Sequence, residues 1–167
     1  MTVESTQDDI LQMIAELLCG AYFEGYTFDT SFTLRFGRSR SENPRYPKQL
    51  PIIELYLLGD WWFYSDKEWD ERLSVMKGLN AHALTEPLQA FELTVLRWCG
   101  DSEVCAVSIV NNVLEIEFKN ERNLYISCAA IEGESWVLLG KEEASKNSVM
   151  SITCEDGKYY NYFAETM

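Results

Sequence analysis

The C-terminal part of the chain alternates apolar and polar residues in short runs separated by turn residues, which is typical of antiparallel β-strands. In the run VLEIEF, Leu114 and Ile116 would face one side of a strand, and Glu115 and Glu117 would face the other. The pair Asn111-Asn112, between VCAVSIV and VLEIEF, is a strong signal for a two-residue hairpin turn. The pattern therefore predicts a sheet with one apolar face and one face that carries carboxylates.

Similar runs elsewhere predict further strands, and three segments predict helices. The other strand segments are 26–36, 51–59, 124–130, 135–140, 148–154 and 159–163. The first helix follows Thr6, a good N-cap, and carries an apolar stripe that ends before Gly20. A capping box of Ser65 and Glu68 begins a second helix. Thr85-Glu86-Pro87 begins a third segment, whose pattern suits a helix but also a strand. The expected fold class is α+β, an antiparallel β-sheet with packed helices.

An internal repeat divides the chain into two similar halves. The matches, in the same order in both halves, are Leu18-Cys19-Gly20 with Trp98-Cys99-Gly100, Phe32-Thr33-Leu34-Arg35-Phe36 with Leu114-Glu115-Ile116-Glu117-Phe118, Leu55-Tyr56-Leu57 with Leu124-Tyr125-Ile126, and Gly59-Asp60-Trp61-Trp62-Phe63 with Gly133-Glu134-Ser135-Trp136-Val137. Each half alone is too small for a good core, so we expect residues 1–80 and 81–167 to pack as a pseudo-twofold pair in one compact unit. Chance similarity between two β-rich halves is the rival explanation.

The second half, LRWCGDSEVCAVSIVNNVLEIEFKNERNLYISCAAIEGESWVLLG, resembles a module of small bacterial proteins. The module has the pattern Leu-x-x-Gly, a Val, a hairpin ending Leu-x-hydrophobic-x-Phe, a second Leu-x-Ile/Val, and Glu-Ala/Ser-Trp, and it often occurs twice per chain. Some of these proteins look like immunity proteins encoded beside polymorphic or contact-dependent growth-inhibition toxins. The resemblance implies an immunity protein whose partner is a cognate toxin. The family usually has Asp-Gly in the turn where this chain has Asn120-Glu121-Arg122.

The net charge is strongly negative, with 14 basic residues against 27 acidic residues and a formal charge of -13. This charge would repel nucleic-acid phosphates and anionic membrane surfaces, so neither is expected as a partner. It would attract a basic protein and speed the encounter with it. Because nuclease toxins are typically basic, a basic nuclease is the expected toxin. Solubility alone is the other explanation of the charge.

Neither a metal nor a cofactor is expected. The five cysteines include no C-x-x-C pair, and His82 is the only histidine, which speaks against a zinc site and against Cys–His catalysis. The cysteines are expected to be free thiols, mostly buried, in a reducing cytosol. The N-terminal MTVESTQDDI is acidic where a signal peptide is basic, and no stretch approaches a membrane span, so we expect a cytoplasmic protein.

The stretch GDWWFYSDKEWDER (59–72) concentrates aromatic and acidic residues. Tryptophans can stack on sugar rings, so a small-molecule or carbohydrate-binding domain is the alternative function. No spacing fixes a working pair of carboxylates, so we expect no enzyme and no catalytic residues. In the repeat Trp62 matches Trp136, which leaves Trp61 as the aromatic residue that the repeat does not explain. On a strand, Trp61 would point away from Trp62.

We therefore expect the toxin-binding surface to combine Trp61 with carboxylates of the second half. The candidate residues are Trp61, Asp101, Glu103, Glu115, Glu117, Glu121 and Glu132. An inhibitor that presents carboxylates can cover the phosphate-binding groove of a nuclease, and opposite charges make the association fast. A solvated sheet face is the plainer explanation for any single one of these acids.

Overall fold

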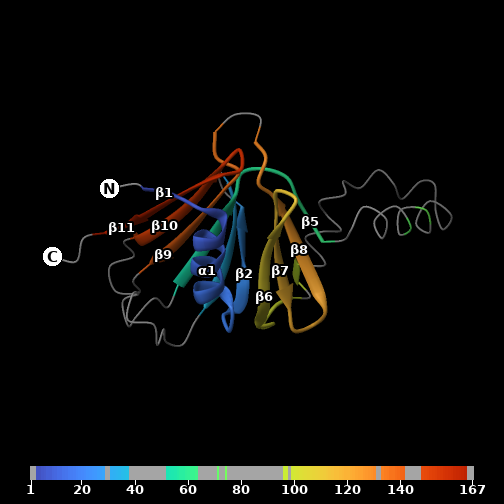
Figure 1. Ribbon diagram of the computed structural model, residues 1–167. Coiled ribbons are helices and arrows are strands. Elements are labelled where there is room, and N and C mark those ends of the chain that lie inside the picture. Colours follow the sequence, from blue (N-terminus) through green and yellow to red (C-terminus); the bar gives the residue numbers. More distant parts are fainter. Residues whose placement is uncertain are drawn as a thin grey trace.

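A computed structural model describes residues 3–28, 31–37, 52–63, 71, 74, 96–97, 99–130, 133–141 and 148–164. Its elements, in chain order, are β1 (Val3–Ser5), α1 (Gln7–Leu18), β2 (Tyr22–Phe28), β3 (Phe32–Gly37), β4 (Ile52–Leu57), β5 (Trp61–Trp62), β6 (Val104–Val110), β7 (Val113–Phe118), β8 (Arg122–Ser127), β9 (Trp136–Lys141), β10 (Ser148–Glu155) and β11 (Lys158–Phe163). Figure 1 shows how these elements are arranged.

The strands form two antiparallel sheets. The larger sheet has seven strands in the order β1-β11-β10-β9-β4-β3-β2, and the smaller sheet has four in the order β5-β8-β7-β6. Each segment that the sequence assigned to a strand contains one, so the prediction of antiparallel sheet is confirmed. α1 is the one helix whose bounds fall within the described residues, so this part of the fold is richer in β-structure than the expected α+β class with several packed helices. The helices expected from Ser65 and from Thr85 lie almost wholly outside the described residues.

The hairpin between β6 and β7 has the predicted turn. Asn111 and Asn112 have φ angles of 51° and 63°, as a two-residue turn of this hand requires. Val110, directly before the turn, pairs with Val113, directly after it. The turn fixes the register of the strands, and with it the faces on which Glu115 and Glu117 lie.

α1 begins as the sequence predicts and packs through its apolar stripe. The backbone N–H of Asp9 donates to Thr6 Oγ1 (3.2 Å), which is the N-cap bond. The buried side chains of the helix are Ile10, Ile14, Leu17 and Leu18. α1 contacts β6 and β11, and Gln7 Nε2 donates to the carbonyl oxygen of Ile109 on β6 (3.2 Å). The helix therefore connects the smaller sheet with the far end of the larger one (Figure 1).

The core lies where the apolar faces of the two sheets meet. Phe23 and Phe36 of the larger sheet contact Phe118 of the smaller sheet, with ring centroids 6.1 and 6.5 Å apart. Phe32 on β3 stacks on Trp61 on β5, with centroids 4.9 Å apart and planes 13° apart. Burial of large aromatic side chains of this kind contributes much of the stability of a small core.

Each sheet combines strands from both halves of the chain. β4, from the first half, pairs with β9, and β8, from the second half, pairs with β5. Three consecutive strands of one half are thus extended by a strand of the other half in both sheets. The predicted division near residue 80 lies outside the described residues and stays a prediction.

The two sheets meet where β2 passes β6. Gly20 N donates to Val104 O, and Asp101 N donates to Phe23 O, both at 2.9 Å. Asp101 and Val104 follow Gly20 and Phe23 by the same number of residues, 81 (101 − 20 and 104 − 23). The antiparallel bridge between Tyr22 and Glu103 has the same spacing. A β-bulge interrupts each strand at the corresponding place, after Phe23 in β2 and after Val104 in β6.

The cross-strand register fixes the positions of the tryptophans. The predicted repeat matches Leu57 with Ile126, and these residues lie opposite Trp136 and Trp61, respectively. If the repeat holds, Trp61 rather than Trp62 takes the place of Trp136. Trp136 is fully buried, and Trp61 is half-buried against the core, whereas Trp62 lies on the opposite face of β5.

Candidate functional site

The outer face of the smaller sheet brings together two of the predicted carboxylates. Along one row, Trp62 lies opposite Tyr125, Tyr125 opposite Glu115, and Glu115 opposite Ser108. In the next row, Glu117 lies between Asn123 and Ala106. These side chains point away from the core because their neighbours along each strand are buried. The acidic face is the name used below for Trp62, Ser108, Glu115, Glu117, Asn123 and Tyr125.

The Glu115 carboxylate is held in place by two neighbours. Asn123 Nδ2 donates to one of its oxygens (2.6 Å), and Ser108 Oγ donates to the other (3.3 Å). These bonds restrict the rotamers of Glu115 and orient its charge before any partner arrives. A pre-oriented carboxylate loses less conformational entropy when it binds a cation.

Glu117 is exposed, and the described part of the chain gives it no ion pair. The ion pairs among these residues are Glu24–Arg35, Glu103–Lys119 and Glu54–Lys141. Neither Glu115 nor Glu117 takes part in them, so both charges on the acidic face are uncompensated within the described residues. The neighbouring thiol of Cys105, in the β6 bulge, donates to the backbone oxygen of Glu117 (3.4 Å). Desolvation and the negative charge of Glu117 raise the pKa of this thiol above 9.0.

An aromatic pair borders the two carboxylates. The rings of Trp62 and Tyr125 stack with centroids 5.9 Å apart and planes 16° apart. Aromatic faces attract guanidinium and ammonium groups, and they do so best beside carboxylates. The combination of Glu115, Glu117 and this pair is suited chemically to arginine or lysine side chains.

Three more of the predicted acids lie at one end of the same sheet. Glu103 is paired with Lys119 (2.6 Å), so its charge is neutralised locally. Asp101 and Glu121 lie in turns with φ angles of 61° and 63°. The backbone conformation of Asp101 and Glu121 shapes these turns. Both residues lie near the acidic face but are not part of it. Glu132 is outside the described residues.

On the outer face of the larger sheet, the charged side chains of β2, β3, β4 and β9 compensate one another. Arg35 Nε lies 3.0 Å from Glu24, and Lys141 donates to Glu54, which also accepts from the hydroxyl of Tyr56 (2.8 Å). Burial raises the pKa of Glu54, but the bonds from Lys141 and Tyr56 outweigh burial and hold the pKa below its ordinary 4.5. Burial lowers the pKa of Lys141, and its bonds to Glu54 and Tyr56 raise it above 10.5. The charges on β2, β3, β4 and β9 are therefore balanced, whereas Glu4 and Glu155 at the other end of the sheet are exposed and have no ion pair among the described residues.

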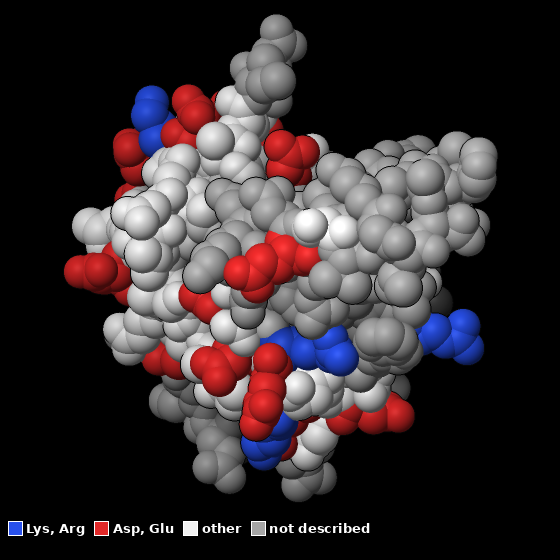
Figure 2. Space-filling view, turned by 90° about the vertical axis from the view of Figure 1, so that its right-hand side faces the viewer, with Lys and Arg blue, Asp and Glu red and all other residues white. Residues whose placement is uncertain are grey.

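The acidic side chains of the described residues lie in several groups on the side of the smaller sheet (Figure 2). Figure 2 looks onto the side of the molecule where the smaller sheet lies, and it shows acidic side chains in several groups with basic side chains between some of them. Of the predicted acids, Glu115 and Glu117 are the two that lie on one sheet face, two residues apart on β7.

Trp61, the aromatic residue expected at the partner surface, is half-buried and packs against the core, and its part in partner binding stays a prediction. It stacks on Phe32 and meets Phe63 edge to face, with centroids 6.2 Å apart. Sequence reasoning missed Ser108, Asn123, Tyr125 and Trp62 as members of the face. The alternation within 122–127, combined with the pairing of that strand with 113–118, would have placed Asn123 and Tyr125 beside the two carboxylates.

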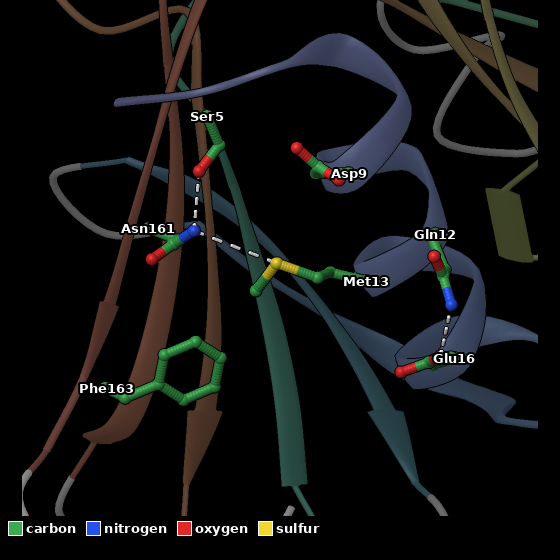
Figure 3. A pocket seen from close by; sticks show the side chains of 7 residues that line it. All are labelled: Ser5, Asp9, Gln12, Met13, Glu16, Asn161 and Phe163. Atoms are coloured by element: carbon green, nitrogen blue, oxygen red, sulfur yellow. Dashed lines mark hydrogen bonds between the residues drawn. The ribbon is translucent and has the colours of Figure 1, made fainter. Parts of the chain in front are cut away.

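Two hollows lie elsewhere on the molecule. The first, about 470 Å³, is lined by Ser5, Asp9, Gln12, Met13, Glu16, Asn161 and Phe163. Figure 3 shows its polar groups bonded to one another: Asn161 Nδ2 donates to Ser5 Oγ (2.6 Å), and Gln12 Nε2 donates to Glu16 (3.1 Å). The second, about 430 Å³, lies over β10 and β11 and is lined by Glu134, Ser151, Thr153, Glu155, Tyr160, Asn161 and Tyr162. No tryptophan lines either of these two hollows, which are formed by described residues.

The described residues contain no group of three or more His, Cys, Asp or Glu side chains arranged to hold a metal. None of the five cysteines, all of which are described, forms a disulfide: Cys99, Cys128 and Cys154 are buried, Cys19 is half-buried, and Cys105 is exposed. Within the same residues, no helix has the length and apolar character needed to cross a membrane.

Comparisons of the chain with protein-family models, with curated proteins and with solved structures found no match.

Proposed function

We propose that the protein is a cytoplasmic immunity protein, which binds a cognate bacterial toxin and neutralises it without catalysis of its own. The observation that carries the proposal is the pair Glu115 and Glu117, uncompensated within the described residues and bordered by the stacked Trp62 and Tyr125. The partner that suits this surface is a basic protein, and a nuclease toxin supplies the necessary lysines and arginines.

The negative charge affects both the rate at which a basic toxin associates and the affinity of the complex. A net charge of -13 attracts a basic partner over distances of about a Debye length. At contact, an arginine can stack on Tyr125 or Trp62 while it pairs with Glu115. An immunity protein has to capture its toxin before the toxin reaches its target, so fast association is a functional advantage.

The alternative, a carbohydrate or small-molecule-binding domain built on the tryptophans, gains no supporting observation. Trp136 is fully buried, Trp61 packs on Phe32, and Trp62 stacks on Tyr125, so these three do not line a common hollow. Trp69 and Trp98 are outside the described residues.

We also propose that the two halves arose from one duplicated unit. The hydrogen bonds of Gly20 and Phe23 with Val104 and Asp101, which recur at the same spacing, support this origin. So does the strand order, since in each sheet three consecutive strands of one half (β2–β4 or β6–β8) are followed by a strand of the other half, β9 or β5; the larger sheet continues with β10, β11 and β1. Duplication would explain why the halves exchange strands: a homodimer that swapped its fourth strands would have the same topology.

Co-expression tests the proposed function. An immunity gene is expected directly downstream of its toxin gene, so the probe is the C-terminal domain of the polypeptide encoded immediately upstream. Induction of this domain should kill cells that lack the protein and spare cells that produce it. The variant Glu115→Gln/Glu117→Gln should need markedly higher expression to protect, because two charges at the contact are lost.

A matched control is Glu4→Gln/Glu155→Gln, which removes the same charge from exposed positions of the larger sheet. It should protect as the wild type does. Equal killing with and without the wild-type protein would refute the immunity function. Equal protection by both double variants would refute only the role of the acidic face and would leave the immunity function standing.

A further inference from the structure

Two buried thiols, those of Cys128 and Cys154, meet in the core. Cys128 directly follows β8 of the smaller sheet, Cys154 lies on β10 of the larger sheet, and both side chains are fully buried. The Cys154 thiol lies 3.5 Å from the carbonyl oxygen of Cys128, and it is also within hydrogen-bonding reach of the Cys128 sulfur. The pair therefore joins the two sheets by a contact that the acidic face does not include.

Three side chains from one row of the larger sheet surround the Cys128 sulfur. Trp136, Cys154 and Tyr159 lie side by side on β9, β10 and β11, and all three are buried. The indole Nε1 of Trp136 donates to Cys128 Sγ (3.5 Å). The Tyr159 hydroxyl, which forms no hydrogen bond of ordinary geometry within the described residues, can donate to the same sulfur. Three donors around one sulfur favour its negatively charged form.

These contacts give the two thiols opposite properties. Hydrogen bonds from Cys154, Trp136 and Tyr159 outweigh the effect of burial and lower the pKa of Cys128 to about 6. The hydrogen bond with Cys128, burial and the negative charge of Cys128 raise the pKa of Cys154. At neutral pH, Cys128 is therefore the thiolate and the better nucleophile, and Cys154 is the protonated thiol.

Two turns adjoin the pair and connect it with the surface. The N–H of Cys128 donates to the carbonyl oxygen of Asn112 (2.9 Å) in the β6–β7 turn. The N–H of Gly157, in the β10–β11 turn, donates to the carbonyl oxygen of Cys128 (2.8 Å). Asn112 and Asp156, one in each turn, are exposed. Exposed turns open locally at a low cost in free energy, so a molecule as small as hydrogen peroxide can reach the Cys128 sulfur.

We propose that Cys128 and Cys154 form an oxidisable dithiol site, which hydrogen peroxide converts into a disulfide between the two sheets. This inference does not depend on the proposed function. The disulfide would tie the end of β8 to β10 across a separation of 26 residues. A covalent link of this length restricts the unfolded chain, so the oxidised protein should resist unfolding better than the reduced protein.

The oxidation takes two steps. The Cys128 thiolate first attacks a peroxide oxygen: an S–O bond forms, the O–O bond breaks, and hydroxide leaves with the electron pair and is protonated to water. This step removes the negative charge that raises the pKa of Cys154. The Cys154 sulfur then attacks the Cys128 sulfenic acid: the S–S bond forms, the S–O bond breaks, and the released hydroxide takes up the Cys154 proton as water. The thiols lose two electrons, and the peroxide gains them.

Mass spectrometry of the oxidised full chain tests the site. The protein is reduced, freed from reductant and treated with hydrogen peroxide in a Cys19→Ser/Cys105→Ser background, which removes the half-buried and the exposed thiol. Its mass should fall by about 2 Da, and digestion should give one peptide pair linked through Cys128 and Cys154. The urea midpoint should rise by about 1 M. If both cysteines can still be alkylated after unfolding, or if either is linked to Cys99, the inference is overturned.

Two single substitutions in the same background test the roles of the two thiols. After peroxide treatment, dimedone, which traps sulfenic acids, should label Cys128 in Cys154→Ser. The matched variant Cys128→Ser should leave Cys154 unlabelled, because the nucleophilic thiolate is gone. Circular dichroism checks that both variants fold, and the disulfide mapped with both cysteines present decides the matter if one does not. Equal labelling of the remaining cysteine in the two variants would overturn the assignment of Cys128 as the nucleophile.

Discussion

Asn123 Nδ2 donates a hydrogen bond of 2.6 Å to the Glu115 carboxylate across the β7–β8 pair. The two residues are diagonal neighbours, since Asn123 lies opposite Glu117 and Tyr125 lies opposite Glu115. One neutral side chain thereby orients one of the two uncompensated charges of the acidic face. A substitution of Asn123 therefore changes the orientation of the Glu115 carboxylate without changing the charge of the acidic face.

Asn123→Ala should weaken toxin binding without changing the electrostatic attraction. Without this bond the toxin has to immobilise the Glu115 side chain itself, which costs about 0.5–1.5 kcal/mol and corresponds to a roughly twofold to tenfold higher Kd. The rise should come from faster dissociation, because the net charge and hence the association rate stay the same. Stopped-flow kinetics measure both rates. Asn161→Ala, which removes the bond to Ser5 far from the acidic face, is the control, and an equal loss in both variants would contradict the assignment.

Trp61→Ala should destabilise the protein, because Trp61 packs on Phe32 and against the core. We expect the free energy of unfolding to fall by about 2–4 kcal/mol, at the lower end of the range for large-to-small core substitutions since Trp61 is only half-buried. Urea denaturation followed by circular dichroism measures the change. A loss below about 0.5 kcal/mol would mean that the stacking contributes nothing and that Trp61 is available as a surface residue.

The outcome for Trp61 shows where the sequence is informative and where it is not. The N-cap at Thr6, the Asn111-Asn112 turn and the placement of Glu115 and Glu117 on one face follow from local patterns, and the structure agrees. The exchange of β9 and β5 between the halves depends on pairing between distant segments, which local patterns do not encode. Trp61 and Trp62 lie on opposite faces of β5, so a match between the halves that is shifted by one residue exchanges their faces.

The sequence predicts the two carboxylates of the acidic face but not the other side chains that surround them. Glu115 and Glu117 stand out in the alternation of β7. Asn123 and Tyr125 join them only through the β7–β8 register, and Trp62 only through the pairing of β5 with β8. β1, a strand of three residues added beside β11, has no signal of its own in the sequence.

Glu121→Gly should stabilise the protein. Glu121 has a φ of 63°, a left-handed conformation that costs a residue with a Cβ about 1 kcal/mol relative to glycine. We expect the free energy of unfolding to rise by about 0.5–1 kcal/mol, measured by urea denaturation. Glu117→Gly, in the middle of β7, should lower it instead, since glycine weakens a strand interior. A loss of stability in Glu121→Gly would show that its side chain makes a contact that outweighs the backbone strain.

Cys105 offers a chemical probe of the acidic face. Desolvation and the charge of Glu117 raise the pKa of its thiol, so at pH 8 little reactive thiolate is present. Glu117→Gln removes the negative charge and should lower the pKa toward 9.0, so a thiol reagent should label Cys105 faster. A Cys19→Ser background removes the half-buried thiol from the readout. Bound toxin should slow the labelling in the wild type, and labelling at an unchanged rate in the complex would place the toxin elsewhere.

The association rate constant of the protein with its toxin, measured by stopped flow at about 50 mM and about 500 mM salt, tests the central claim most directly. We predict that the wild-type rate falls by about tenfold or more at high salt, because opposite charges steer the encounter. Glu115→Gln/Glu117→Gln should begin lower and show a weaker salt dependence, while Glu4→Gln/Glu155→Gln should follow the wild type more closely. A wild-type rate that is indifferent to salt, or two double variants with the same rates, would contradict binding through the acidic face.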